Sequence, residues 1–87
     1  MSTLRLRSDR LQWLEADGEV VALDEHALVY LNTNPSGALL WRALVAGATR
    51  DELVRCLLDA FDVDEDTAGS DVDRFLAELE TRGLIQH

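Results

Sequence analysis

The chain has 87 residues, of which 47% are hydrophobic, and a formal net charge of −9. This length supports one domain with a modest core and is too short to enclose a large active site. All positive charge comes from eight arginines, without a single lysine, so the surface disfavours nucleic-acid backbones and anionic membranes as partners.

The sequence also bears on the cellular compartment. Cys56 is the only cysteine, which excludes an internal disulfide. The first residues lack the apolar segment of a signal peptide, and no apolar run reaches membrane-spanning length. We therefore expect a cytoplasmic protein.

Residues 1–9 are polar and charged, with Arg5, Arg7 and Asp9 interrupting any apolar run. This composition predicts a flexible N-terminal arm or, at most, a marginal first strand. We place a single domain over residues 10–87.

The first half of that domain has the pattern of a β-meander. Apolar stretches at 11–14 and 20–23 flank Asp17-Gly18, a dipeptide that tolerates the positive φ angles of a tight hairpin turn. A second turn at 24–26 leads into residues 27–33, which are rich in strand formers. The pattern predicts a three-stranded antiparallel sheet with its last strand at an edge.

The second half has the signals of three helices. Asn34-Pro35 suits the N-cap and first position of a helix that runs to Ala46. Thr49 and Glu52 form a capping-box pattern for a second helix, and the acidic run 62–66 favours the start of a third. The predicted fold class is α+β and winged-helix-like, with a three-stranded antiparallel sheet followed by three α-helices.

No combination of residues suggests catalysis. His26 and His87 lack metal-ligand spacing, and Cys56 lies between apolar residues of the second helix, as a packing thiol does. The acids at 62–66 lack the glycine and terminal glutamate of a calcium loop. We expect a protein that is not an enzyme and that binds no cofactor or metal.

Residues 34–41, Asn-Pro-Ser-Gly-Ala-Leu-Leu-Trp, resemble the Asn-x-Ser/Thr-Gly-x-x-Leu/Ile-Trp signature of PqqD-like proteins. These are recognition elements for ribosomally synthesised and post-translationally modified peptides (RiPPs). Weaker family patterns follow in the correct order at 46–53, 61–64 and 71–76. Thr33 departs from the pattern, because the family often has Leu there.

The resemblance implies that the third strand accepts the leader of a precursor peptide as an added antiparallel strand, in a cleft closed by the third helix. The implied partners are this leader and a RiPP-modifying enzyme, such as a radical SAM enzyme or a leader protease with its cyclase. The candidate peptide-binding residues are Leu28, Val29, Tyr30, Leu31, Asn32 and Thr33 on the strand, and Asp71, Arg74, Phe75 and Glu78 on the helix. Which face of the strand lines the cleft stays open. Proline at Val29 or Leu31 is expected to remove a ladder donor and weaken binding, with disturbance of the sheet as a second possible effect.

Two other functions compete with the peptide adaptor. A winged-helix DNA-binding transcriptional regulator needs a basic recognition helix, whereas the third helix carries Asp71, Asp73, Glu78 and Glu80 against Arg74 and Arg82. A structural module could instead form a homodimer through the edge strand. For each charged residue of the third helix, the alternative to a role in peptide binding is a place on an ordinary solvated helix face.

Overall fold

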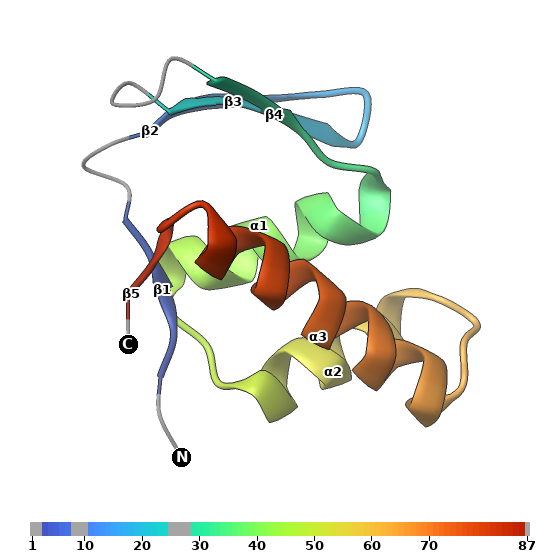
Figure 1. The fold of residues 1–87 in the computed structure, drawn as a ribbon. Helices are drawn as coiled ribbons and strands as arrows, with labels where there is room; N and C mark the ends of the chain where they lie inside the picture. Colours follow the sequence, from blue (N-terminus) through green and yellow to red (C-terminus); the bar gives the residue numbers. More distant parts are fainter. Residues whose placement is uncertain (1–2, 8–10, 25–28, 87) are drawn as a thin grey trace.

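Strands lie at both ends of the sequence, and the helices lie between them. The computed structural model describes residues 3–7, 11–24 and 29–86. In chain order the elements are β1 (Arg5–Leu6), β2 (Leu11–Ala16), β3 (Glu19–Asp24), β4 (Val29–Asn32), α1 (Pro35–Ala46), α2 (Arg50–Ala60), α3 (Glu65–Thr81) and β5 (Ile85–Gln86). The helices lie on one side of the sheet formed by β2, β3 and β4 (Figure 1).

The sheet of β2, β3 and β4 is an antiparallel meander in that order. Asp17 and Gly18 connect β2 to β3 with φ angles of 54° and 78°, the two positive values that a type I′ turn requires. The predicted hairpin is therefore confirmed. β4 pairs with β3 from Asp24↔Val29 to Val21↔Asn32 and forms one edge of the sheet.

A second sheet joins the two ends of the described chain. β1 pairs with β5 in antiparallel register, and Leu4 forms a bridge with Ala48. Leu4 and Leu6 are buried in the core, so residues 3–7 contain the short first strand that was the alternative to a flexible arm. Their alternation with Arg5 and Arg7 is a strand pattern whose partner comes from the far end of the sequence.

The α+β class, the antiparallel strands and the three helices are confirmed. The strands, however, lie in two sheets, whereas a single sheet was expected. The turn predicted at 24–26 falls largely outside the described residues.

The helices start at the predicted capping signals. The Oδ1 atom of Asn34 accepts a hydrogen bond from the Gly37 N–H at 2.8 Å, with Pro35 as the first helical residue. Thr49 and Glu52 form the complete capping box of α2. At α3, the Asp64 carboxylate accepts from the Thr67 N–H at 2.7 Å. None of the described helices is long and apolar enough to cross a membrane.

One core lies between the sheets and the helices. Trp41 of α1 is fully buried and meets the half-buried Trp13 of β2 in an edge-to-face contact, with ring centroids 6.0 Å apart. Leu84 also reaches the core, so the chain folds back after α3. The largest other fully buried side chains are Leu40, Leu44, Leu53, Leu57, Val20 and Val72.

An ion pair joins the start of α2 to the middle of α3. The Arg50 guanidinium donates to both carboxylate oxygens of Asp73, at 2.7 and 3.0 Å. These hydrogen bonds from Arg50 lower the pKa of Asp73 below its ordinary value of 3.8, and they raise the pKa of Arg50. The backbone N–H of Thr67 lowers the pKa of Asp64 in the same way.

These lowered values predict how acid affects stability. A carboxyl group with a lower pKa in the folded state stabilises the fold above its unfolded pKa, and this contribution is lost as the pH falls through the folded pKa. Asp73→Asn removes one such contribution. We therefore expect the difference in unfolding free energy between wild type and Asp73→Asn to shrink between about pH 5 and pH 2 in urea titrations. Asp59→Asn, at an exposed acid of α2, is the matched control. Parallel pH curves for wild type and Asp73→Asn would contradict the assignment.

Candidate functional site

The outer edge of β4 presents free backbone groups. The Thr33 N–H donates to the Val20 carbonyl at 2.9 Å, which marks Thr33 and Val20 as a hydrogen-bonded pair. Because such pairs alternate along an antiparallel ladder, Leu31 and Ala22 form the next one. The backbone N–H and C=O of Tyr30 and Asn32 therefore point away from β3. No strand of the described chain pairs with this edge.

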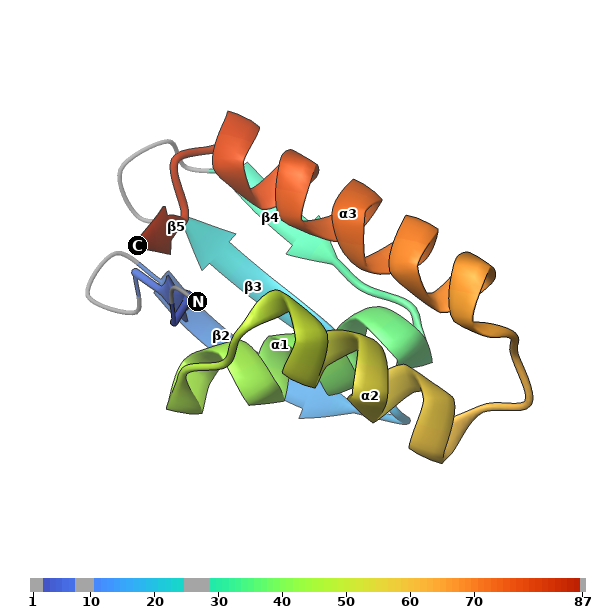
Figure 2. The same ribbon diagram turned by 90° about the horizontal axis from the view of Figure 1, so that it is seen from below.

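A groove lies between the end of β4, the start of α1 and the side of α3. Figure 2 shows α3 running along the β4 side of the molecule. The cavity has a volume of about 230 Å³. Its lining residues, which define the β4–α3 groove, are Asn32, Thr33, Asn34, Ser36, Gly37, Leu40, Asp71, Arg74, Phe75 and Glu78.

Six of the predicted site residues line this groove. They are Asn32, Thr33, Asp71, Arg74, Phe75 and Glu78. Val29, Tyr30 and Leu31 lie in β4, next to the groove in sequence, while Leu28 falls outside the described residues. Their role in peptide binding stays a prediction.

The expectation for proline at Val29 or Leu31 needs a correction. Both residues are in hydrogen-bonded pairs with β3, opposite Asp24 and Ala22. Proline there would break the sheet itself. The donors that face an added strand belong to Tyr30 and Asn32. Which residues of β4 direct their backbone groups outward depends on strand order and register, and the sequence alone does not reveal these.

Thr33 ends the strand and turns the chain toward α1. Its Oγ1 atom accepts the hydrogen bond of the Val20 N–H at 3.1 Å, in place of a backbone carbonyl. The side chain thus completes the β3–β4 ladder at the position where the main chain leaves it. This gives a physical role to the one residue that departs from the family pattern.

Gly37 allows the first turn of α1 to lie close to α3. A Cβ atom at this position would come within 2.9 Å of the Thr33 Cβ and 3.3 Å of the Phe75 Cε1. A contact below about 3 Å with Thr33 leaves no room for any side chain. Glycine therefore lets the half-buried Phe75 ring pack at the floor of the groove.

The charged side chains on the α3 wall of the groove form only exposed, weak ion pairs. Asp71 and Arg74 are 3.7 Å apart, and Glu78 and Arg82 are 3.4 Å apart. The Arg74 side chain is 76% exposed. Such exposed pairs contribute only about 0–1 kcal/mol to stability. These side chains are therefore available to interact with a ligand in the groove.

A much smaller cavity lies next to the groove. It has a volume of about 30 Å³ and is lined by Trp41, Leu79 and Arg82, together with Asn32, Thr33, Phe75 and Glu78. The Trp41 Nε1–H is buried and finds no acceptor in the described part of the chain. A volume of this size is about that of one water molecule in the liquid.

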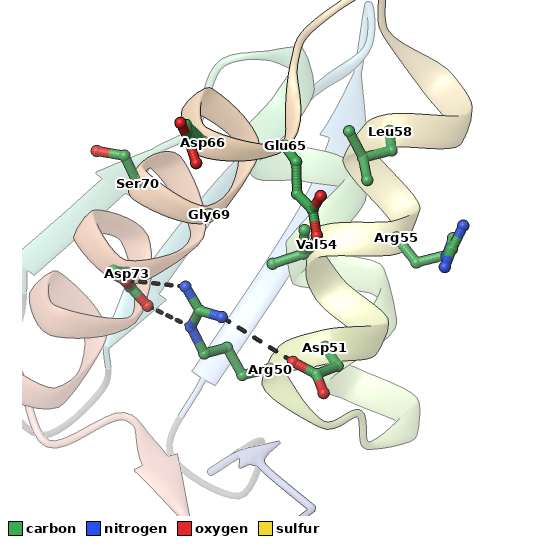
Figure 3. A pocket seen from close by; sticks show the side chains of 10 residues that line it. All are labelled: Arg50, Asp51, Val54, Arg55, Leu58, Glu65, Asp66, Gly69, Ser70 and Asp73. Atoms are coloured by element: carbon green, nitrogen blue, oxygen red, sulfur yellow. Dashed lines mark hydrogen bonds and ion pairs between the residues drawn. The ribbon is translucent and has the colours of Figure 1, made fainter.

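A larger hollow lies elsewhere, between α2 and α3, and has a volume of about 710 Å³ (Figure 3). Arg50 bridges it by its ion pairs with Asp73 and Asp51. Asp73 and Phe75 are two residues apart, which places them about 200° apart around the helix. This hollow and the β4–α3 groove therefore lie on opposite sides of α3. The Arg50–Asp73 pair joins α2 to α3 across this hollow, which is a structural role.

Sequence reasoning missed four groove residues. Asn34, Ser36, Gly37 and Leu40 line the groove, although the motif that contains them was interpreted as a helix start. The same residues start the helix and line the groove, because the first turn of α1 forms the end wall of the groove. His26 and His87 fall outside the described residues, and Cys56 is half-buried in α2.

A free strand edge beside a polar groove defines this protein as a small α+β domain suited to hold an extended chain. Residues 19–85 match the family described as coenzyme PQQ synthesis protein D (PqqD). The match spans more than half of the sequence, so the chain belongs to the PqqD family. No curated protein matches the sequence.

Two solved structures are similar to this chain. One is TbiB1 in complex with the TbiA(beta) leader peptide, with 27% sequence identity, 94% of each chain covered and a TM-score of 0.84. The other is a lasso peptide synthetase B1 complexed with the leader peptide, with 22% identity, 99% of this chain and 100% of that chain covered, and a TM-score of 0.83. The second likeness concerns the fold alone.

The role of Thr33 leads to a stability prediction. Thr33→Val keeps the shape of the side chain but leaves the N–H of the fully buried Val20 without its acceptor. We expect this to lower the unfolding free energy by about 1–3 kcal/mol in urea titrations. Thr33→Ser keeps the hydroxyl and is expected to lose less. Equal stability of the Val and Ser variants would contradict the assignment.

Proposed function

We propose that this protein is a non-catalytic adaptor that captures the leader of a ribosomally synthesised precursor peptide and presents it to a modifying enzyme. The leader pairs with β4 as an added antiparallel strand, next to α3. The observation that carries this proposal is the free backbone edge of β4 at Tyr30 and Asn32, beside the β4–α3 groove.

In strand addition, the backbone provides affinity and the side chains provide specificity. Hydrogen bonds to the backbone of Tyr30 and Asn32 provide affinity that is independent of the peptide sequence. Side chains of the peptide alternate, and those directed toward α3 meet Phe75 and the charged residues Asp71, Arg74 and Glu78. These contacts distinguish one leader from another.

The similarity to TbiB1, which was solved with a leader peptide bound, supports the same ligand class for this chain. Membership of the PqqD family supports it independently. Tethering the leader raises the local concentration of the attached core segment at the enzyme and lowers the apparent KM without adding chemistry. The client enzyme is a radical SAM enzyme or a leader protease with its cyclase.

The winged-helix DNA-binding regulator fits this surface poorly. α3 carries Asp71, Asp73, Glu78 and Glu80 against Arg74 and Arg82, and the whole chain has a net charge of −9. A DNA-binding face neutralises phosphates with basic residues. Base recognition by α3 would bring these acids against the DNA backbone.

The proposal is tested by fluorescence polarisation with the synthetic leader of the precursor peptide encoded beside the gene. We expect saturable binding with a Kd near micromolar, on the order of −8 kcal/mol. A scrambled peptide of the same composition and duplex DNA serve as controls. Binding of the scrambled peptide with equal affinity, or binding of DNA alone, would refute the adaptor function.

A pair of variants at one position tests strand addition itself. Asn32→Pro removes the outward N–H of β4, while Asn32→Ala changes the side chain and keeps the N–H. Because one hydrogen bond contributes about 0.5–1.5 kcal/mol, we expect the proline variant to bind the leader about fivefold more weakly than the alanine variant. Circular dichroism first establishes that both are folded. Equal affinities would show that the leader does not pair with this edge.

A further inference from the structure

One polar group of the core lacks a partner within the described residues. Trp41 of α1 is fully buried, and its Nε1–H finds no acceptor in the part of the chain that the structure describes. A donor that loses its hydrogen bond to bulk water on folding needs another acceptor, because leaving it unpaired destabilises the fold. Ordered water commonly fills this role in folded proteins. The Trp41 Nε1–H therefore calls for an acceptor beyond the described residues.

The cavity of about 30 Å³ beside the groove has the size and the polarity for such an acceptor. We call it the Trp41 cavity. Its apolar lining residues are Trp41, Phe75 and Leu79, and its polar ones are Asn32, Thr33, Glu78 and Arg82. One water molecule takes up about 30 Å³ in the liquid and forms two to four hydrogen bonds, so this cavity suits a single water. A methyl group has a similar size but cannot accept a hydrogen bond.

The Trp41 cavity adjoins the path of the proposed leader strand. Asn32, Thr33, Phe75 and Glu78 line both this cavity and the β4–α3 groove. The backbone groups of Asn32 face away from β3, toward an added strand. A leader that pairs with this edge therefore runs beside residues that line the cavity. Its oxygen atoms come within reach of a water held there.

The polar lining residues can hold a water without losing their present contacts. The Thr33 Oγ1 accepts from the Val20 N–H, and its hydroxyl proton is still available to donate. The Glu78–Arg82 pair is 3.4 Å long, and both side chains are partly exposed. A water that accepts from Trp41 keeps two O–H groups. One can donate to an oxygen of the lining, and the other remains for a ligand in the groove.

We propose that one water molecule occupies the Trp41 cavity, accepts the hydrogen bond of the Trp41 Nε1–H and donates a hydrogen bond to an oxygen atom of the bound leader. This inference rests on the proposed function and adds to it a fixed water as part of the groove. Trp41 acts on the leader through this water, so it is a positioning residue. The tryptophan that ends the motif at residues 34–41 thereby contributes to recognition as well as to the core.

Nuclear magnetic resonance tests the water directly in the unaltered protein. The sequence has two tryptophans, so a ¹⁵N-labelled sample gives two indole N–H signals, and Trp13→Phe assigns them. We expect a nuclear Overhauser effect between water and the Trp41 Nε1–H, with the sign of a water that tumbles with the protein. The same effect is expected in the complex with the synthetic leader of the precursor peptide encoded beside the gene.

An isosteric replacement tests the contribution of the N–H group to leader binding. In 3-benzothienylalanine a sulfur atom replaces the indole N–H and the shape is kept. The 87-residue chain is made by chemical synthesis with this residue at position 41 or, as the matched control, at position 13. Trp13 lines neither the groove nor the Trp41 cavity.

Fluorescence polarisation with the same leader compares the two analogues with wild type. We expect Trp41→3-benzothienylalanine to bind about fivefold more weakly, as the loss of one hydrogen bond requires. The analogue at position 13 is expected to stay within about twofold of wild type, because it leaves the water in place. Circular dichroism establishes that both analogues are folded. The magnetic resonance measurement does not depend on that outcome.

Three results would overturn the inference while leaving the proposed function intact. They are the absence of a water contact at the Trp41 Nε1–H in the free protein, the loss of that contact in the leader complex, and equal leader affinities of wild type and the position 41 analogue. The second result would show that the leader displaces the water. Absence of any leader binding would instead refute the proposed function, and the water contact of the free protein is measured independently of it.

Discussion

The change from strand to helix between Thr33 and Gly37 is the constraint on which the rest of the structure depends. The Thr33 hydroxyl completes the ladder with Val20, and Asn34 starts α1 immediately afterwards. With no intervening loop, the first turn of α1 closes the end of β4. Gly37 then lets this turn approach Phe75 of α3. One short segment thus fixes the sheet edge, the helix start and the end wall of the groove.

The edge of β4 would be an aggregation risk in many proteins, because unpaired strand edges associate with one another. Here the edge is only four residues long, and α3 lies beside it. The acidic surface adds repulsion between copies, since the net charge is −9. Short length, a neighbouring helix and like charge leave the edge open to an extended peptide while they disfavour pairing between copies.

Three of the hollows differ in the interactions between the residues that line them. Between α2 and α3, Arg50 pairs with Asp73 and Asp51, so these charges are already matched within the fold. In the β4–α3 groove, the Asp71–Arg74 and Glu78–Arg82 pairs are 3.7 and 3.4 Å apart, against 2.7 Å for Arg50–Asp73, and the Arg74 side chain is 76% exposed. A third hollow, lined by Pro35, Leu57, Phe61 and Val63 together with Asn34, Ser36 and Asp71, has a largely apolar wall. By volume alone, the hollow between α2 and α3 would be the candidate ligand site. The unpaired backbone of β4 and the exposed apolar surface instead indicate the other two.

The sequence by itself determined the local structure and the family resemblance. The hairpin at Asp17-Gly18 and the starts of α1 and α2 depend on turn and capping chemistry that acts within four residues. Only the tertiary structure decided the pairing of β1 with β5, the outward direction of the Asn32 N–H and the placement of Asn34 and Asp71 in the lining of one groove. These features join segments far apart in the chain. The strand register and the direction of the backbone groups depend on packing that no local pattern encodes.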